Sequence, residues 1–122
     1  MTKGAALQQF FERFMTAYAV SSVPDDAVFP YLTYEYVTDA WGGGEVGLTV
    51  NLWFYTESEA IPNAKVTQIS EAIGSGGINL KCDGGFVWLK RGSPWAQSLS
   101  DDTAPGIKRR YLNVTAEYMT LN

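Results

Sequence analysis

Residues 46–55 read Val-Gly-Leu-Thr-Val-Asn-Leu-Trp-Phe-Tyr, and a large apolar side chain stands at every second position. An apolar period of two predicts a β-strand that buries one face and leaves the other face open. The buried face is expected to carry Val46, Leu48, Val50, Leu52 and Phe54. The opposite face is expected to carry Gly47, Thr49, Asn51, Trp53 and Tyr55.

Two hairpins are predicted around this strand. Residues 30–37 also alternate, and the glycine-rich stretch Trp41-Gly42-Gly43-Gly44 joins them to residues 46–55, which indicates an antiparallel pair. Farther along, Asp83-Gly84 separates two strand-like runs, residues 78–82 and 85–90. Asp-Gly between such runs is among the strongest local signals for a hairpin. The chain therefore favours a largely antiparallel sheet.

The sequence also predicts two helices and a last strand. In residues 4–20, apolar side chains recur at helical spacing, at Leu7, Phe10, Phe11, Phe14 and Tyr18. Residues 60–73 form a second candidate helix, which ends at Gly74. Residues from 107 onward alternate again and complete the sheet.

These elements predict a single α+β domain over residues 1–122, with an antiparallel or mixed sheet, helices packed on one face, and the order α-β-β-α-β-β-β. The aromatic stripe of the first helix is expected to cover the apolar face of the sheet. That face would include Leu48, Val50, Leu52, Leu112, Val114 and Ala116.

Composition narrows the function. The net charge is −4 and the only basic runs are two or three residues long, which argues against a nucleic-acid footprint. The chain has no histidine and one cysteine, Cys82, so the commonest general base and nucleophile pairs are missing. We expect no enzymatic activity, no metal and no cofactor. No signal peptide or membrane span is recognisable, and synthesis in the cytoplasm is expected.

Two loops carry the candidate interface residues. Residues 38–45 and 91–106 are predicted to be the longest connections, and each holds a tryptophan without alternating neighbours. The candidates for a contact with another copy or a partner are Trp41, Gly42, Gly43, Gly44, Trp95, Asp101 and Asp102. Asp101-Asp102 is a weak candidate for acid–base chemistry, because catalytic carboxylates usually converge from separate elements. Lys108-Arg109-Arg110 is expected to be a solvated strand edge.

The second half of the chain resembles a known family. The phrase Arg91-Gly92-Ser93-Pro94-Trp95-Ala96-Gln97 is followed by Asp101-Asp102 and then by residues 107–118, Ile-Lys-Arg-Arg-Tyr-Leu-Asn-Val-Thr-Ala-Glu-Tyr. In this phrasing and in its element order, the chain resembles the tail terminator (tail completion, or minor capsid) proteins of siphophages and prophages. The similarity extends from about residue 5 to residue 120.

This resemblance implies a structural protein of the virion. It implies a hexameric ring of identical copies that caps the tail tube, ends its polymerisation and joins the tail to the head. The partners would be the tail-tube protein and a head-completion protein, with DNA only as cargo in the channel and no membrane contact. The acidic balance suits a channel through which DNA slides.

Two alternatives stay open. In the first, the chain is also a virion protein, but it is a head-completion or connector protein, or a tail-tube subunit. The other is a small-ligand-binding, cone-shaped α+β domain, in which Tyr34, Tyr36 and Tyr118 would line a pocket.

Overall fold

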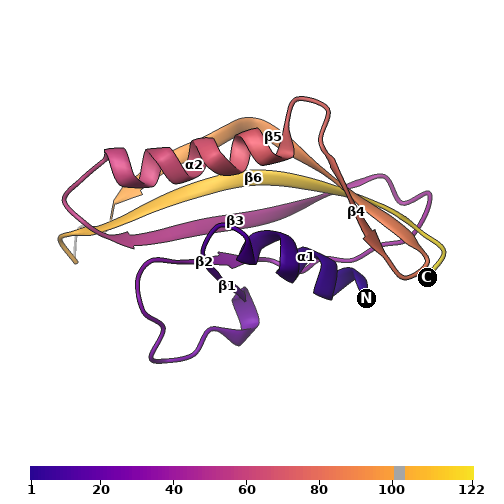
Figure 1. Ribbon diagram of the computed structural model, residues 1–122, viewed down its shortest axis with the longest axis horizontal. Coiled ribbons are helices and arrows are strands. Elements are labelled where there is room, and N and C mark those ends of the chain that lie inside the picture. Colours follow the sequence, from indigo (N-terminus) through magenta and orange to yellow (C-terminus); the bar gives the residue numbers. More distant parts are fainter. Residues whose placement is uncertain (101–103) are drawn as a thin grey trace.

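The alternating segments form the centre of one sheet. Within residues 1–100 and 104–122, which this computed structural model describes, six strands follow the order β1-β2-β3-β6-β5-β4 (Figure 1). The central pair consists of β3, Glu45–Tyr55, and β6, Ile107–Thr120, which are antiparallel along the whole of β3. On either side lie β2, Tyr31–Tyr34, and β5, Gly85–Ser100.

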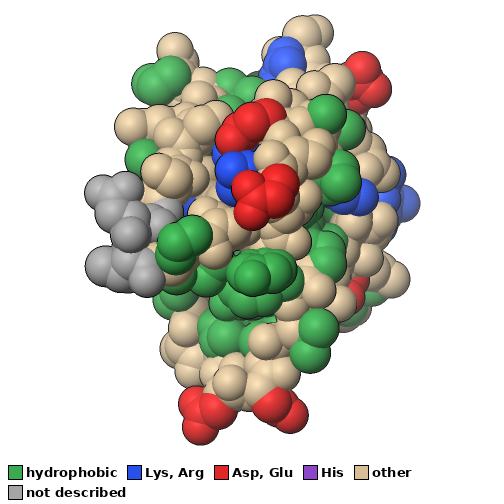
Figure 2. Space-filling model, turned by 90° about the vertical axis from the view of Figure 1, so that its left-hand side faces the viewer, with side chains coloured by type: hydrophobic (Ala, Val, Ile, Leu, Met, Phe, Trp, Pro, Cys, Tyr) green, Lys and Arg blue, Asp and Glu red, His purple; other side chains and the backbone are tan. Residues whose placement is uncertain are grey.

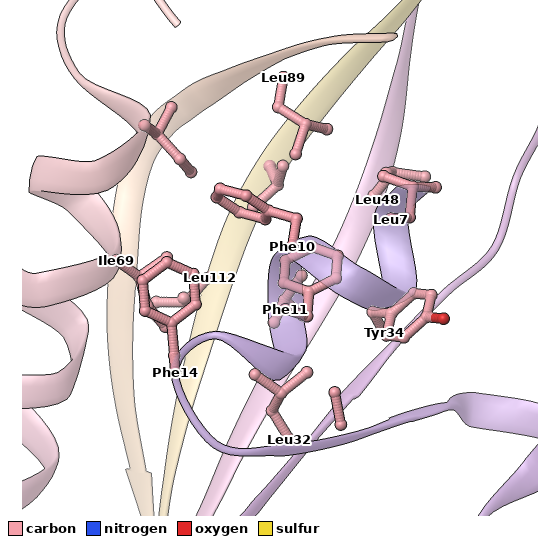
Figure 3. Packing of buried hydrophobic residues seen from close by; sticks show 14 of the residues in the cluster. Leu7, Phe10, Phe11, Phe14, Leu32, Tyr34, Leu48, Ile69, Leu89 and Leu112 are labelled. Carbon is pink, nitrogen blue, oxygen red and sulfur yellow. The ribbon is translucent and has the colours of Figure 1, made fainter. Parts of the chain in front are cut away.

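Both helices lie on the same face of this sheet. They are α1, Lys3–Glu12, and α2, Ala60–Ile73, and side chains of both enter one apolar cluster with the strands (Figure 3). The chain is therefore an α+β fold with helices packed against a sheet, as predicted. The predicted sheet residues of the core are confirmed, each at most 1% exposed: Leu48, Val50, Leu52, Leu112, Val114 and Ala116.

The sheet curls around α1. Its two edge strands are β1, Thr16–Ala19, and β4, Ile78–Cys82, and both contact α1 although they stand at opposite edges. The sheet is mixed, because β1 is parallel to β2 while the other neighbours are antiparallel. The predicted hairpin at Asp83-Gly84 joins β4 to β5.

The prediction of a helix over residues 4–20 is wrong beyond Glu12. After a turn, residues 16–19 become β1, and a short 3-10 turn, η1, Val20–Ser22, follows. Ala17 enters the core at 2% exposure, whereas the ring of Tyr18 packs against Tyr31, with 5.9 Å between the centroids. Phe14 is buried as predicted although it follows the helix, and pairing with β2 overrides the helical periodicity in residues 16–19.

The prediction of a loop over residues 91–106 is wrong for residues 91–100. This stretch continues β5, and residues 96–100 pair with residues 108–112 of β6 after a register shift between Arg91 and Ala96. Gly92 lies within the irregular segment, where an added Cβ would stand 2.8 Å from the Cβ of Asn113. The bulge accommodates Gly92 and Pro94, residues that are typical of loops. It can do so because β6 is long enough to pair with β5 on both sides of the bulge.

The prediction of a solvated edge is wrong for Arg110, which is 2% exposed. Its position on β6 places it on the face covered by the helices, where Nε donates to Oδ1 of Asn63 at 3.1 Å. Its Nη2 pairs with the carboxylate of Glu59, which also accepts from Nζ of Lys108 at 3.1 Å. This cluster fastens the start of α2 to β6.

Candidate functional site

The loop before β3, residues 38–44, has a tied backbone and an exposed tryptophan, and we call it the Trp41 loop. The backbone N–H of Trp41 donates to the carbonyl of Thr120 at 2.8 Å, which ties the loop to the end of β6. Oδ1 of Asp39 accepts from the N–H of Ala40 at 2.8 Å. The side chain of Trp41 remains 66% exposed. The loop therefore has a backbone tied to β6 and an indole exposed to the surroundings.

Glycine is required in this loop. Gly42 and Gly44 have φ of +92° and +79°, the left-handed region that side chains disfavour. At Gly43, an added Cβ would lie 2.0 Å from Oδ2 of Asp39, so the carboxylate occupies the space of a side chain. The three glycines predicted as interface residues thus shape the turn that carries Trp41.

Other apolar side chains gather at the same end of the molecule. The carbonyl of Met1 accepts a hydrogen bond from the N–H of Asp83, and the N–H of Leu121 donates to the carbonyl of Gly84. Both termini therefore lie beside the β4–β5 turn (Figure 1). We call this end, with the Trp41 loop, the terminal end. Its large apolar side chains that are at least 40% exposed are Met1, Tyr36, Val37, Trp41 and Leu121.

The opposite end of the sheet has an apolar hollow. Its volume is about 390 Å³ and its lining comes from three elements: the loop before β2, the end of β3 and the first turn of α2. We call it the apolar cleft; it is lined by Val28, Phe29, Pro30, Phe54, Tyr55, Thr56 and Ile61. Figure 2 looks at this end and shows hydrophobic side chains gathered in its middle.

The cleft has a buried floor and exposed walls. Phe54 is 3% exposed and belongs to the core, while Val28, Tyr55 and Ile61 are 76%, 69% and 56% exposed. The rings of Phe29 and Tyr55 lie 6.1 Å apart between their centroids. Such exposed apolar side chains around a hollow are typical of a protein contact rather than of a free surface.

The wall formed by α2 is fixed in place. Oγ of Ser58 accepts from the N–H of Ala60 at 3.1 Å and so caps the first turn, in which Ile61 stands. Glu59 joins the same turn to β6, and its hydrogen bonds with Lys108 and then Arg110 lower the pKa of its carboxyl group. The first turn of α2 is therefore held both by its cap and by β6.

The other predicted interface residues have different surroundings. Trp95 lies in β5, not in a loop, and packs partly buried against the core. Its Nε1 is buried without a hydrogen-bond partner in the part of the chain that the structure describes. Asp101 and Asp102 lie outside the described residues. The structure does not bring Trp95 together with the Trp41 loop.

The side chains that could take part in a reaction are mostly buried or hydrogen-bonded within the fold. Burial, and then the charge of Asp83, raises the pKa of the Cys82 thiol, which disfavours the reactive thiolate. Tyr34 and Tyr118 are 4% and 1% exposed, and their hydroxyls donate to Oε1 of Gln8 and to the carbonyl of Val37. These two tyrosines pack in the core instead of lining an open pocket.

Among residues 1–100 and 104–122, no three His, Cys, Asp or Glu side chains come together in a way that could hold a metal ion. In the same stretches, no helix has both the length and the apolar character to cross a bilayer.

Sequence reasoning missed the apolar cleft. Val28-Phe29-Pro30 is an apolar run inside a segment otherwise rich in loop-forming residues, and Ile61 precedes the proline of the first helical turn. Both were signals of apolar side chains without an obvious place in the core. Only the fold shows that they meet Tyr55 at one end of the sheet.

Comparison with known proteins adds no family to this description. The sequence matches no family model and no curated protein.

Proposed function

We propose that this chain is a structural, non-enzymatic subunit of a bacteriophage tail that assembles with copies of itself into a ring. The station in the virion that we propose is the tail terminator, which caps the tail tube and joins the tail to the head. The resemblance of residues 91–97 and 107–118 to that family supports this station, and the α+β fold is compatible with it.

One observation carries the proposal: two different apolar surfaces are exposed at opposite ends of the same chain. A closed ring of identical subunits needs a heterologous contact, in which one patch of each copy meets a different patch of the next. A dimer with twofold symmetry needs only one self-complementary patch. The net charge of −4 also suits a ring through which DNA passes without binding.

The first test is the mass of the purified chain in solution. Sedimentation should give a mass near six times 13.4 kDa, and negative-stain images should show rings with a central channel. A protein that remains monomeric at high concentration and forms no rings on tail tubes would contradict the proposal.

Deletion of the gene from the phage or prophage that encodes it separates the three stations. Loss of a tail terminator should give tails of uncontrolled length. Loss of a tube subunit should give no tails, and loss of a head-completion protein should give tails of normal length beside unattached heads. Either of the last two results would replace the terminator assignment.

A further inference from the structure

We propose that Trp41 of one copy inserts into the apolar cleft of the next copy, and that this contact is the repeating junction of the ring. The inference rests on the proposed function and names the two surfaces that meet. It assigns the cleft one occupant, the indole of a second copy of this chain.

Exposed apolar side chains are not scattered over the surface. In residues 1–100 and 104–122, nine large hydrophobic side chains are exposed, and only Val20 belongs to neither the terminal end nor the apolar cleft. The terminal end has five of them and the cleft has three. The two ends of the sheet therefore concentrate the surface that gains most from leaving water.

The two surfaces have opposite shapes. Trp41 stands on a glycine turn whose backbone is bonded to β6, and the space beside Gly42 and Gly44 is open in the positions where side chains would extend. The cleft is concave, and its volume of about 390 Å³ falls in the usual range for sites that enclose a small organic group, about 300 to 1,000 Å³. A projecting indole and an apolar hollow are complementary.

The two surfaces cannot meet within one chain. The Trp41 loop precedes Glu45 and the cleft includes Tyr55, so the 11 residues of β3 separate them, and a strand of that length spans roughly 34 Å. A head-to-tail contact between copies covers both surfaces at every junction. A single unrelated partner at either end would leave the other surface in water.

The energy expected of such a contact is concentrated in few side chains. A tryptophan buries about 150 to 250 Å² and is enriched among the residues that dominate interface energetics. The backbone at Trp41 is held before binding by the hydrogen bond to Thr120, which limits the conformational entropy that the loop loses on association. The Ser58 cap and Glu59 hold the helix backbone at Ile61 in the same way.

The test uses one variant for each surface. Trp41→Ala removes the projecting side chain, and Ile61→Glu places a charge in the cleft wall while suiting the first turn of a helix. Each variant alone should sediment as a monomer at concentrations where the wild type forms rings, with at least a tenfold weaker association. Val20→Glu, at a site as exposed as Ile61 and outside both surfaces, is the matched control and should assemble normally.

Mixing the two variants gives the decisive measurement. The Ile61→Glu chain keeps an intact Trp41 and the Trp41→Ala chain keeps an intact cleft, so the mixture should form one-to-one heterodimers that cannot extend. Monomers in the mixture would show that the two surfaces do not meet. Rings formed by either variant alone would equally overturn the inference, with unfolding measured in parallel to confirm that each variant is folded.

These outcomes are distinct from failure of the proposed function. If both variants still form rings and the deletion phenotype is that of a terminator, the function holds and the contact is elsewhere. If the mixed variants form heterodimers but deletion of the gene leaves tails unchanged, the contact holds and the station in the virion is wrong.

Discussion

The segments around Trp41 and Trp95 look alike in the sequence and differ in the fold. Trp41 directly precedes Gly42 and Trp95 follows Pro94, both lack alternating neighbours, and both were predicted to lie in loops. Trp41 is 66% exposed on a turn, whereas Trp95 is part of β5 and packs against the core. The difference comes from pairing: residues 96–100 form a ladder with β6, and one backbone hydrogen bond joins the Trp41 loop to the last residue of that strand.

The contrast shows that loop-type composition does not by itself place an aromatic side chain at an interface. A bulge lets a strand carry glycine and proline, so the long neighbouring strand decides whether the segment is paired. The variants Phe14→Ala, Trp95→Ala and Trp41→Ala can break or sharpen the contrast between the two tryptophans, and acid tests the attachment of α2.

The largest effect should come from a fully packed aromatic, which sets the scale. Phe14 is 8% exposed and its ring lies 5.2 Å from that of Phe10. Phe14→Ala should lower the free energy of unfolding by about 3 to 5 kcal/mol because it leaves a cavity. Chemical denaturation measures this loss, and a value under about 1 kcal/mol would mean that Phe14 does not belong to the core.

Trp95→Ala should follow, with a loss of about 1 to 3 kcal/mol, because only part of the indole is packed. Denaturation of the variant at a concentration where the chain is monomeric isolates this loss from assembly. A loss close to zero would place Trp95 with Trp41 as a surface residue and would restore the interface interpretation of both.

Acid should weaken the attachment of α2 to β6. Hydrogen bonds with Lys108 and Arg110 lower the pKa of Glu59, so its ionised form is favoured in the folded state. The contribution of Glu59 to the stability of the fold is therefore complete above the ordinary glutamate pKa of about 4.3. It is lost as the pH falls through the lowered pKa of the folded state. Melting temperatures of wild type and Glu59→Gln should differ near neutral pH and converge below that window. A constant difference at all pH values would exclude this titration.

Trp41→Ala should have the smallest effect on the fold. We expect a change in the free energy of unfolding within about 0.5 kcal/mol, because the side chain has little packing to lose. The backbone bond from Trp41 to Thr120 is retained in the variant. A loss as large as that of Trp95→Ala would indicate that the indole supports the loop in the monomer, and the contrast between the two tryptophans would disappear.

Much of the architecture was predictable because its signals are local. The period of two in residues 46–55 and 112–118, the Asp83-Gly84 turn and Gly74 at the end of α2 each follow from backbone geometry and solvent exclusion. The stripe Leu7, Phe10, Phe11 also predicted its own burial. In these segments the tertiary contacts agree with the local preference.

Other features depended on which segments meet. Residues 16–19 became a strand because β2 offered a partner, residues 96–100 because β6 did, and Arg110 could be buried because Glu59 and Asn63 reached it. The apolar cleft combines three segments that are separate in the sequence. By itself the sequence determined the α+β class, the central strands and the apolar face that they share. Only the tertiary structure decided the strand edges and the end surfaces, because both depend on partners distant in the chain.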